Sequence, residues 1–195
     1  IEKAPKQKPT ACVGVDTGIN ALASLSTGEQ LGTDIPDLIK LSKRKKWGSK
    51  GHKRAQRSIR QRIDEVARDV VASGASLIVT EDLLGITHKT RRRVGKQTRR
   101  SIGIWNVRHW FNRLEQRCEM HCVSFRRVRP EYTSQSCSRC GHVDRKNRNG
   151  DVFKCRACGH TANADVQASL NILSRFFSGP YGAGCKAKQG LMSPA

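Results

Sequence analysis

Four cysteines arranged as two close pairs constrain the fold of this chain more than any other feature. Cys137 and Cys140 form the first pair, Cys155 and Cys158 form the second, and two residues separate the members of each pair. This spacing lets both sulfur atoms of a tight turn face one tetrahedral zinc ion. Four thiolates leave no open position for water on the metal, so the pattern predicts a structural zinc site that stabilises a segment too short to fold alone.

Two disulfides in a secreted domain are the alternative reading of these pairs. The remaining cysteines form no regular framework, which disfavours it: Cys12, Cys118, Cys122 and Cys185. Unpaired thiols are typical of a reducing compartment, so a cytoplasmic location is expected. Gly141 and Gly159 follow the two pairs and are expected to adopt the positive φ that such turns often need.

Positive charge is the second constraint. The chain has 37 Lys and Arg against 16 Asp and Glu, a formal net charge of +21, which predicts a polyanionic partner. No apolar run approaches the length of a membrane span. No terminal amphipathic helix combines this charge with a face of Trp, Phe and Leu, so nucleic acid is favoured over a membrane surface.

The cations gather in two blocks, 40–62 and 89–100, and neither contains an acidic residue. A solvated helix face is the alternative, but such faces usually include acids, and like charges at this density repel unless phosphates neutralise them. Trp47 and His52 interrupt the first block and are candidates for stacking on bases, although an exposed Trp can equally pack locally. The predicted nucleic-acid-binding residues in these blocks are Lys43, Arg44, Lys45, Lys46, Lys50, Lys53, Arg54, Arg57, Arg91, Arg92 and Arg93.

The apolar periodicity predicts a three-stranded meander followed by alternating helices and strands. Strands are expected over 11–16, 21–26, 30–33, 77–81 and 123–128. A helical pattern runs from about 36 until Gly74, with Ile59, Ile63, Val66 and Val70 as its core stripe. A second helix is expected over 104–118. The last begins after Asn163, the expected N-cap, with Val166, Leu170, Leu173 and Phe177 as its buried stripe.

This order of elements is that of a ribonuclease H-like α/β fold. Asp16 ends the central strand, Glu81 ends its parallel neighbour, and Asp165 lies in the first turn of the last helix. Ligands of open α/β sheets gather at the carboxyl ends of the strands, so the three acids are expected to meet there. Crowded carboxylates bind protons unless divalent cations neutralise them, and hard oxygen ligands suit Mg²⁺ or Mn²⁺.

Three segments carry a specific resemblance. Residues 14–18 (GVDTG), 79–83 (VTEDL) and 165–172 (DVQASLNI) resemble the three motifs of RuvC nucleases. Together with the cysteine segments 133–141 and 153–159, they make the chain similar to transposon-encoded TnpB proteins and type V CRISPR effector nucleases. The resemblance covers most of residues 11–176.

The resemblance implies a metal-dependent RuvC nuclease that cuts DNA under the direction of a guide RNA. Asp16, Glu81 and Asp165 match the catalytic triad, and the four cysteines match the zinc ligands. Arg148 resembles a position near the scissile phosphate. Hydrolysis would use two metal ions, with Asp16 bridging both while Glu81 and Asp165 each hold one, and would leave a 5′ phosphate.

The resemblance also implies a domain division. The mixed five-stranded RuvC sheet with its helices would comprise 11–131 and 161–177, including a lid loop over 84–103. The zinc ribbon would be an insertion over 132–160, and 178–195 a flexible tail. Family members carry an N-terminal region that recognises guide and target, so 1–10 is expected to be a linker from such a region, and the chain the catalytic half of a larger protein.

Two departures from the family pattern keep other functions open. Gln167 and Ser169 replace an Asn and an Ala of the common third motif. A nuclease-dead regulator that binds nucleic acid is therefore one alternative, and a strand-transferring transposase with the same sheet is another.

Overall fold

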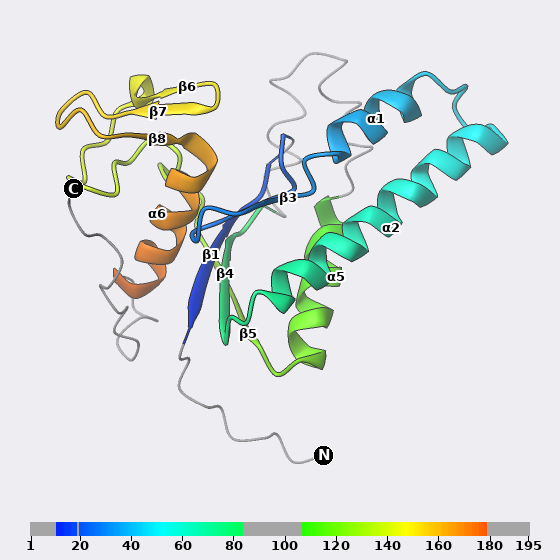
Figure 1. Ribbon diagram of the computed structural model, residues 1–195, viewed down its shortest axis with the longest axis horizontal. Coiled ribbons are helices and arrows are strands. Elements are labelled where there is room, and N and C mark those ends of the chain that lie inside the picture. Colours follow the sequence, from blue (N-terminus) through cyan, green and yellow to red (C-terminus); the bar gives the residue numbers. More distant parts are fainter. Residues whose placement is uncertain (1–10, 19, 84–106, 179–195) are drawn as a thin grey trace.

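The computed structural model describes residues 11–18, 20–83 and 107–178 of the chain (Figure 1). The predicted linker and lid loop fall outside these residues, as do Arg91, Arg92, Arg93 and the predicted tail apart from Ser178, which ends the last helix. The elements are β1 (Cys12–Asp16), β2 (Ala23–Leu25), β3 (Gln30–Leu31), α1 (Ile35–Lys43), α2 (Lys50–Ala72), β4 (Leu77–Glu81), α5 (Val107–Met120), β5 (Ser124–Val128), the 3₁₀ helix η1 (Arg145–Asn147), β6 (Arg148–Asn149), β7 (Val152–Lys154), β8 (Thr161–Asn163) and α6 (Ala164–Ser178).

The main sheet has five strands in the order β3-β2-β1-β4-β5. β1 pairs antiparallel with β2 and parallel with β4, and β4 pairs parallel with β5. The mixed five-stranded sheet flanked by helices is therefore confirmed. The parallel pairing of β1 with β4 places the ends of these two strands, Asp16 and Glu81, at the same edge of the sheet.

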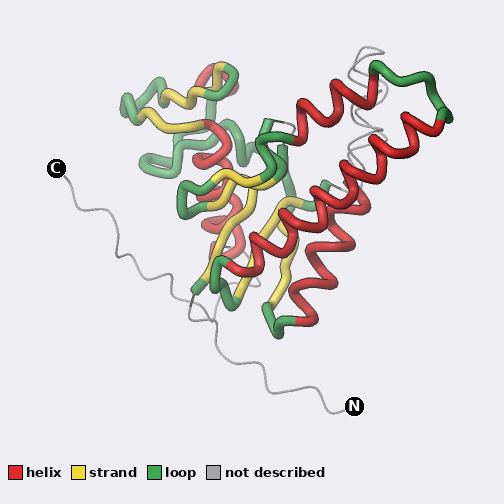
Figure 2. The backbone as a smooth tube through the Cα atoms, turned by 45° about the vertical axis from the view of Figure 1, so that its right-hand side comes forward, coloured by secondary structure: helices red, strands yellow, loops and turns green. Residues whose placement is uncertain are grey.

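Helices cover both faces of the sheet. α2 and α5 lie on one face and α6 lies on the other, as Figures 1 and 2 show from two directions. The predicted stripe of α2 is buried in the hydrophobic core on its face of the sheet. Val13 and Ile78 of the sheet and Trp110 and Phe111 of α5 belong to the same core. Leu77 and Val79 point the other way and pack with Ile172 and Phe176 of α6. This alternation along β4 is the ordinary period of two of a strand covered on both faces.

The helical pattern predicted from residue 36 to Gly74 is two helices, because the chain turns at 44–49. Gly48 has a φ of +78°, a conformation that a helix cannot contain. Ser49 then caps α2, since its hydroxyl accepts the backbone N–H of His52 at 3.1 Å. α1 and α2 therefore form a hairpin that projects beyond the sheet (Figure 1).

The buried stripe predicted for α6 is correct only in part, because Leu173 and Phe177 are half-buried and pack with Ile172 and Phe176. The buried residues of α6 are Ala164, Asp165, Gln167, Ala168, Ser169, Ile172 and Phe176, whereas Leu170 is 36% exposed. The reason is the close approach of α6 to β1: a Cβ built on Gly14 would lie 2.1 Å from the carbonyl oxygen of Ser169. Small residues such as Ala164, Ala168 and Ser169 therefore occupy much of the buried face of α6, beside Ile172 and Phe176.

Residues 132–160, which we term the cysteine module, lie beside the N-terminal end of α6 (Figure 1). Its strands β6 and β7 form a three-stranded antiparallel sheet with β8, which follows the module and leads directly into α6. Phe153 is fully buried and packs with Cys137, Cys155 and Ala164. This small core joins the cysteine pairs to the start of α6.

Candidate functional site

The four cysteines of the module converge on one point. Their sulfur atoms all lie within 4.8 Å of one another. The shortest separations join different pairs, 3.7 Å from Cys137 to Cys158 and 3.6 Å from Cys140 to Cys155, far beyond the roughly 2.05 Å of a disulfide. The disulfide alternative therefore fails, and the arrangement fits a tetrahedral ion with four thiolate ligands.

Backbone hydrogen bonds prepare the two cysteine turns for a metal. Gly141 and Gly159 have φ values of +75° and +73°, as predicted, and their N–H groups donate to the carbonyl oxygens of Cys137 and Cys155. The backbone N–H of Cys158 donates to the sulfur of Cys155 and lowers the pKa of that thiol to about 6, whereas the pKa of the neighbouring Cys140 thiol is raised to about 12. A low pKa favours the thiolate, which is the form that binds metal.

Asn147 links the two turns, and the sequence pattern did not reveal it. This side chain is 1% exposed. Its amide group donates to the carbonyl oxygen of Gln135, and its side-chain oxygen accepts the backbone N–H of Arg156, both at 3.0 Å. One buried amide therefore connects the segments that carry the first and second cysteine pairs.

The three predicted acids gather at the carboxyl edge of β1 and β4. Asp16 and Glu81 end these strands, and Asp165 lies in the first turn of α6 with Asn163 as its N-cap, as predicted. Burial, followed by the charges of Glu81 and Asp165, raises the pKa of Asp16 to about 8. The carboxylates of Glu81 and Asp165 are therefore close enough to repel that of Asp16.

The carboxylate oxygens of the three acids do not converge on a single point. Among the His, Cys, Asp and Glu side chains of the described ranges, only the four cysteines form a group of three or more whose ligand atoms lie close enough together to hold one ion. Asp165 instead pairs with Arg148, whose Nη2 lies 2.6 Å from its Oδ1. Arg148 belongs to β6, so the cysteine module delivers a cation to the acid at the start of α6.

Glu81 is held by a residue that the sequence did not single out. The hydroxyl of Thr133 donates to its carboxylate. Burial raises the pKa of Glu81, and the Thr133 hydrogen bond opposes that shift. Thr133 is fixed in turn, because the side-chain amide of Asn171 donates to the backbone carbonyl oxygens of Thr133 and Ser136, each at 2.7 Å.

The two departures in the third motif are accommodated. Gln167 is fully buried between α6 and the first cysteine turn, where it donates to the carbonyl oxygen of Ser136 and accepts from the hydroxyl of Ser138. The hydroxyl of Ser169 donates to the carbonyl oxygen of Val166 within α6. Gln167 therefore fastens the module to the helix that carries Asp165, and every polar atom introduced here has a partner.

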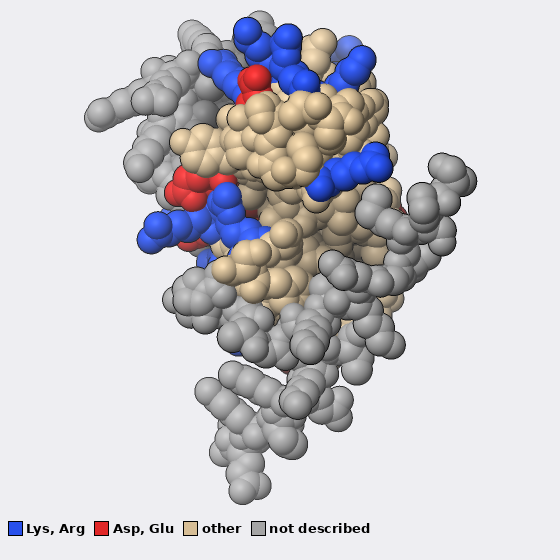
Figure 3. Space-filling view, turned by 90° about the vertical axis from the view of Figure 1, so that its left-hand side faces the viewer, with Lys and Arg blue, Asp and Glu red and all other residues tan. Residues whose placement is uncertain are grey.

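Arg148 contacts Asp165, but the predicted basic residues of the first block lie apart from the acids. They occupy the α1–α2 hairpin, at the end of the molecule opposite the cysteine module (Figure 1). All of them except the half-buried Lys43 are exposed. The module has a second group of cations, which the sequence pattern did not predict. Figure 3, in which the side of the module faces the viewer, shows these cations at the top of the molecule. The exposed members of this group are Arg139, Arg145, Lys146, Lys154 and Arg156.

Comparisons with known proteins agree with this arrangement. Residues 108–172 match the family described as the Cas12f1-like TNB domain. The chain is 37% identical to the CRISPR-associated endodeoxyribonuclease Cas12f1 of Sulfoacidibacillus thermotolerans over 103 residues, 52% of this chain and 22% of that protein. It is 30% identical to a TnpB-like protein of Aquifex aeolicus over 133 residues, 67% of this chain and 43% of that protein.

A solved structure shares the fold. The cryo-EM structure of a Cas12f1–sgRNA–target DNA complex superposes with a TM-score of 0.62 at 22% identity, covering 89% of this chain and 51% of the Cas12f1 chain. The five-stranded sheet with its cysteine module thus defines the class, a Cas12f-like α/β protein. More particularly, the chain is a relative of TnpB proteins and type V CRISPR effectors, so the resemblance read from its motifs is confirmed. It spans between about a fifth and about half of the length of these relatives.

The helices of the described residues include none that is both long and apolar enough to cross a membrane.

Proposed function

We propose that the chain is the catalytic half of an RNA-guided DNA endonuclease of the RuvC type, dependent on Mg²⁺ or Mn²⁺. The observation that carries this proposal is the meeting of Asp16, Glu81 and Asp165 at one sheet edge, where burial and mutual charge raise the pKa of Asp16 to about 8. A group of acids so placed is unfavourable without cations and is typical of a functional site. Its oxygen ligands fit hard divalent ions.

In the proposed mechanism Asp16, Glu81 and Asp165 would hold two divalent ions through their carboxylates. Bound ions would supply an activated water for in-line attack on phosphorus and would stabilise the leaving 3′ oxygen. The water oxygen forms the new bond to phosphorus as the bond to the 3′ oxygen breaks, which leaves a 5′ phosphate. Thr133 orients Glu81 through its hydroxyl, and Arg148 moves from Asp165 to a non-bridging oxygen of the scissile phosphate.

The proposed structural zinc site holds the module in place for this chemistry. Cys137, Cys140, Cys155 and Cys158 would bind Zn²⁺ and thereby fix β6, which carries Arg148. The contact of Arg148 with Asp165 supports this coupling between the two sites. The domain division given above, with the ribbon inserted over 132–160, belongs to the same proposal.

The proposed partners are a guide RNA and a DNA substrate. Curated relatives are named endodeoxyribonucleases or RNA-guided DNA endonucleases, and the Cas12f1 structure contains an sgRNA and target DNA. The predicted cations of the hairpin, Lys43 to Arg57, would contact phosphates, and binding would weaken steeply with salt. We expect these partners to be met in the cytosol, where the thiols stay reduced.

Cleavage of labelled DNA tests the proposal. The 195-residue chain, and separately its whole gene product with guide RNA, is incubated with Mg²⁺ and with single- or double-stranded DNA. Asp16→Asn should abolish cleavage without weakening binding, whereas Asp69→Asn, a matched change on the surface of α2, should leave the rate unchanged. Equal behaviour of wild type and Asp16→Asn on every substrate would instead support the nuclease-dead alternative, and joined rather than cut products would support a transposase.

A further inference from the structure

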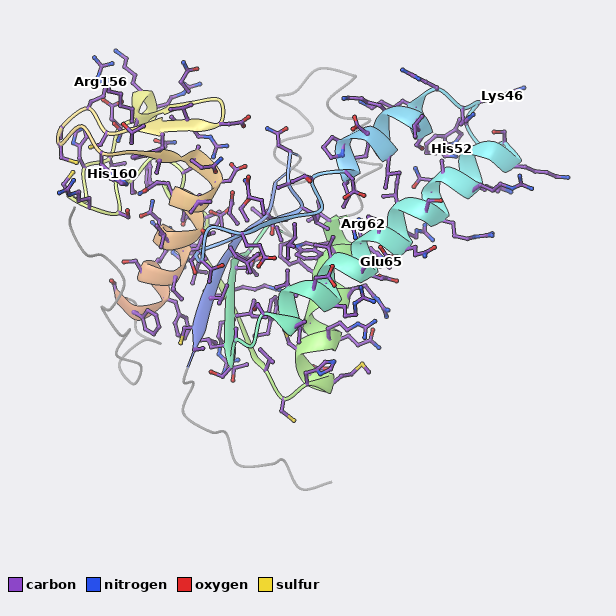
Figure 4. The ribbon with its side chains drawn as sticks, viewed as in Figure 1. Lys46, His52, Arg62, Glu65, Arg156 and His160 are labelled. Atoms are coloured by element: carbon purple, nitrogen blue, oxygen red, sulfur yellow. The ribbon has the colours of Figure 1, made fainter. Side chains whose placement is uncertain are left out.

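A basic pocket of about 460 Å³ lies at the tip of the α1–α2 hairpin. Figure 4 labels Lys46 and His52 at this end of the molecule, far from the cysteine module, where Arg156 and His160 are labelled. The pocket is thus separate from the three acids. Its lining comes from the turn before α2 and from the first turns of that helix: Trp47, Gly48, His52, Lys53, Gln56, Arg57 and Arg60.

The cations of this pocket have no acidic partners. In the described part of the chain, no carboxylate forms an ion pair with Lys53, Arg57 or Arg60, and the first turn of α2 contains no acid. The other end of the same helix differs, since Arg62 pairs with Asp34 and Glu65, and Arg68 with Asp69. Unpaired cations near a helix N-terminus repel both one another and the helix dipole, so the pocket favours an anion.

The pocket also contains an aromatic platform. Trp47 is 71% exposed, and its ring centroid lies 4.5 Å from that of His52 at an interplanar angle of 45°. His52 therefore supports the indole on one side and leaves much of its surface open. An indole held in this way can stack on a nucleobase, whereas binding of phosphates alone does not require an aromatic ring.

His52 supplies a second, independent observation. The side chain is 5% exposed, yet its Nε2 has no hydrogen-bond partner among the described residues. Buried polar atoms are nearly always paired, so an unpaired nitrogen on a residue that lines a pocket indicates a ligand with a complementary polar group. The ligand must then combine an anion, a flat apolar ring and a hydrogen-bonding edge.

We propose that this pocket binds one unpaired nucleotide of a single-stranded nucleic acid. Its base stacks on Trp47, its edge hydrogen-bonds to Nε2 of His52, and its flanking phosphates contact Lys53, Arg57 and Arg60. Lys53 and Arg57 are one helical turn apart, a rise of about 6 Å that suits successive phosphates of one strand. The inference rests on the proposed function only in taking nucleic acid as the partner, and it requires no cleavage.

The test measures binding of fluorescein-labelled 15-mers of dU and U, and of a 15-base-pair duplex, by anisotropy without added Mg²⁺. Trp47→Ala should weaken binding of a single strand about tenfold, since stacking of one base contributes about that factor. His52→Phe, which keeps a ring against Trp47 but removes the nitrogen, should weaken it by about threefold or more. Duplex binding should change less than twofold for both variants.

Arg68→Ala is the matched control, because it removes a cation from the far end of the same helix. Circular dichroism confirms that each variant is folded. A larger loss for U than for dU identifies RNA as the source of the nucleotide, a larger loss for dU identifies DNA, and equal losses identify a site that reads only base and phosphate. The proposal is overturned if Trp47→Ala weakens single-strand binding no more than Arg68→Ala, or weakens duplex binding equally. A protein that fails to cut DNA but shows the Trp47 effect would refute the nuclease proposal alone.

Discussion

Replacing Gly14 by alanine should damage both the stability and the candidate site of this protein, because α6 rests directly on the backbone of β1. The added Cβ would lie 2.1 Å from the carbonyl oxygen of Ser169 and 3.0 Å from Cβ of Leu173. The first of these atoms is helix backbone, which cannot rotate away as the end of a side chain can. The whole helix must therefore move by about 1 Å, in an interior packed too closely to absorb the shift.

The expected loss of stability of Gly14→Ala follows from the cost of overpacking. Inserting a methylene into a well-packed core costs about 1–3 kcal/mol, and a clash with backbone lies at the upper end of that range. For a chain of this size, about 3 kcal/mol lowers Tm by about 6–12 °C. Since α6 carries Asp165, a displacement of about 1 Å should also lower any cleavage rate by about 100-fold.

Differential scanning calorimetry of Gly14→Ala measures the first effect. Gly51→Ala is the matched control, because Gly51 lies in α2 and a Cβ there would meet only side-chain atoms, the nearest at 3.6 Å. The control should leave Tm unchanged or raise it, since Ala is the better helix former. A fall in Tm of less than about 2 °C for Gly14→Ala would refute the close packing of α6 on β1.

Three further predictions concern the acids and the cysteine module. The pKa of Asp16 is raised to about 8 from its ordinary 3.8, so the folded state loses stability as pH rises from about 4 to 8. At pH 8, Asp16→Asn should therefore unfold at a higher urea concentration than wild type. This difference should shrink towards pH 4. Removal of zinc with a chelator should release thiols and selectively increase amide hydrogen exchange in β6–β8, and unchanged exchange would contradict a metal-built module. Arg148→Ala should lower the free energy of unfolding, measured in urea, by about 2 kcal/mol, because it leaves Asp165 buried without its cation. Arg148→Lys should restore part of that loss. Equal stability of all three proteins would contradict the importance of the ion pair.

Local patterns were sufficient to predict the sheet and the positions of the acids. β4 occupies Leu77–Glu81 as expected, and the stripe Ile59, Ile63, Val66 and Val70 is buried. The short spacing within each cysteine pair also left few possible geometries. In such cases, periodicity or spacing over a few residues determines which side chains face the interior.

Other features depend on contacts between distant segments, which a local pattern does not contain. The close approach of α6 to Gly14 brings small residues such as Ala168 and Ser169 into the buried face of the helix, beside Ile172 and Phe176. Thr133 reaches Glu81 across 52 positions of sequence, and Asn171 reaches the backbone of Thr133 across 38. The pairing of Arg148 with Asp165 likewise requires the module to fold back on the start of α6.

Anomalous diffraction from crystals soaked in Mn²⁺ tests the central claim most directly, because it locates the ions relative to the acids. We predict two Mn²⁺ peaks about 4 Å apart, both in contact with Asp16, with Glu81 beside one and Asp165 beside the other, and Arg148 withdrawn from Asp165. A zinc peak among the four cysteines would show that the protein in the crystal is intact. Manganese absent from the three acids in the presence of that zinc peak would contradict a two-metal nuclease site.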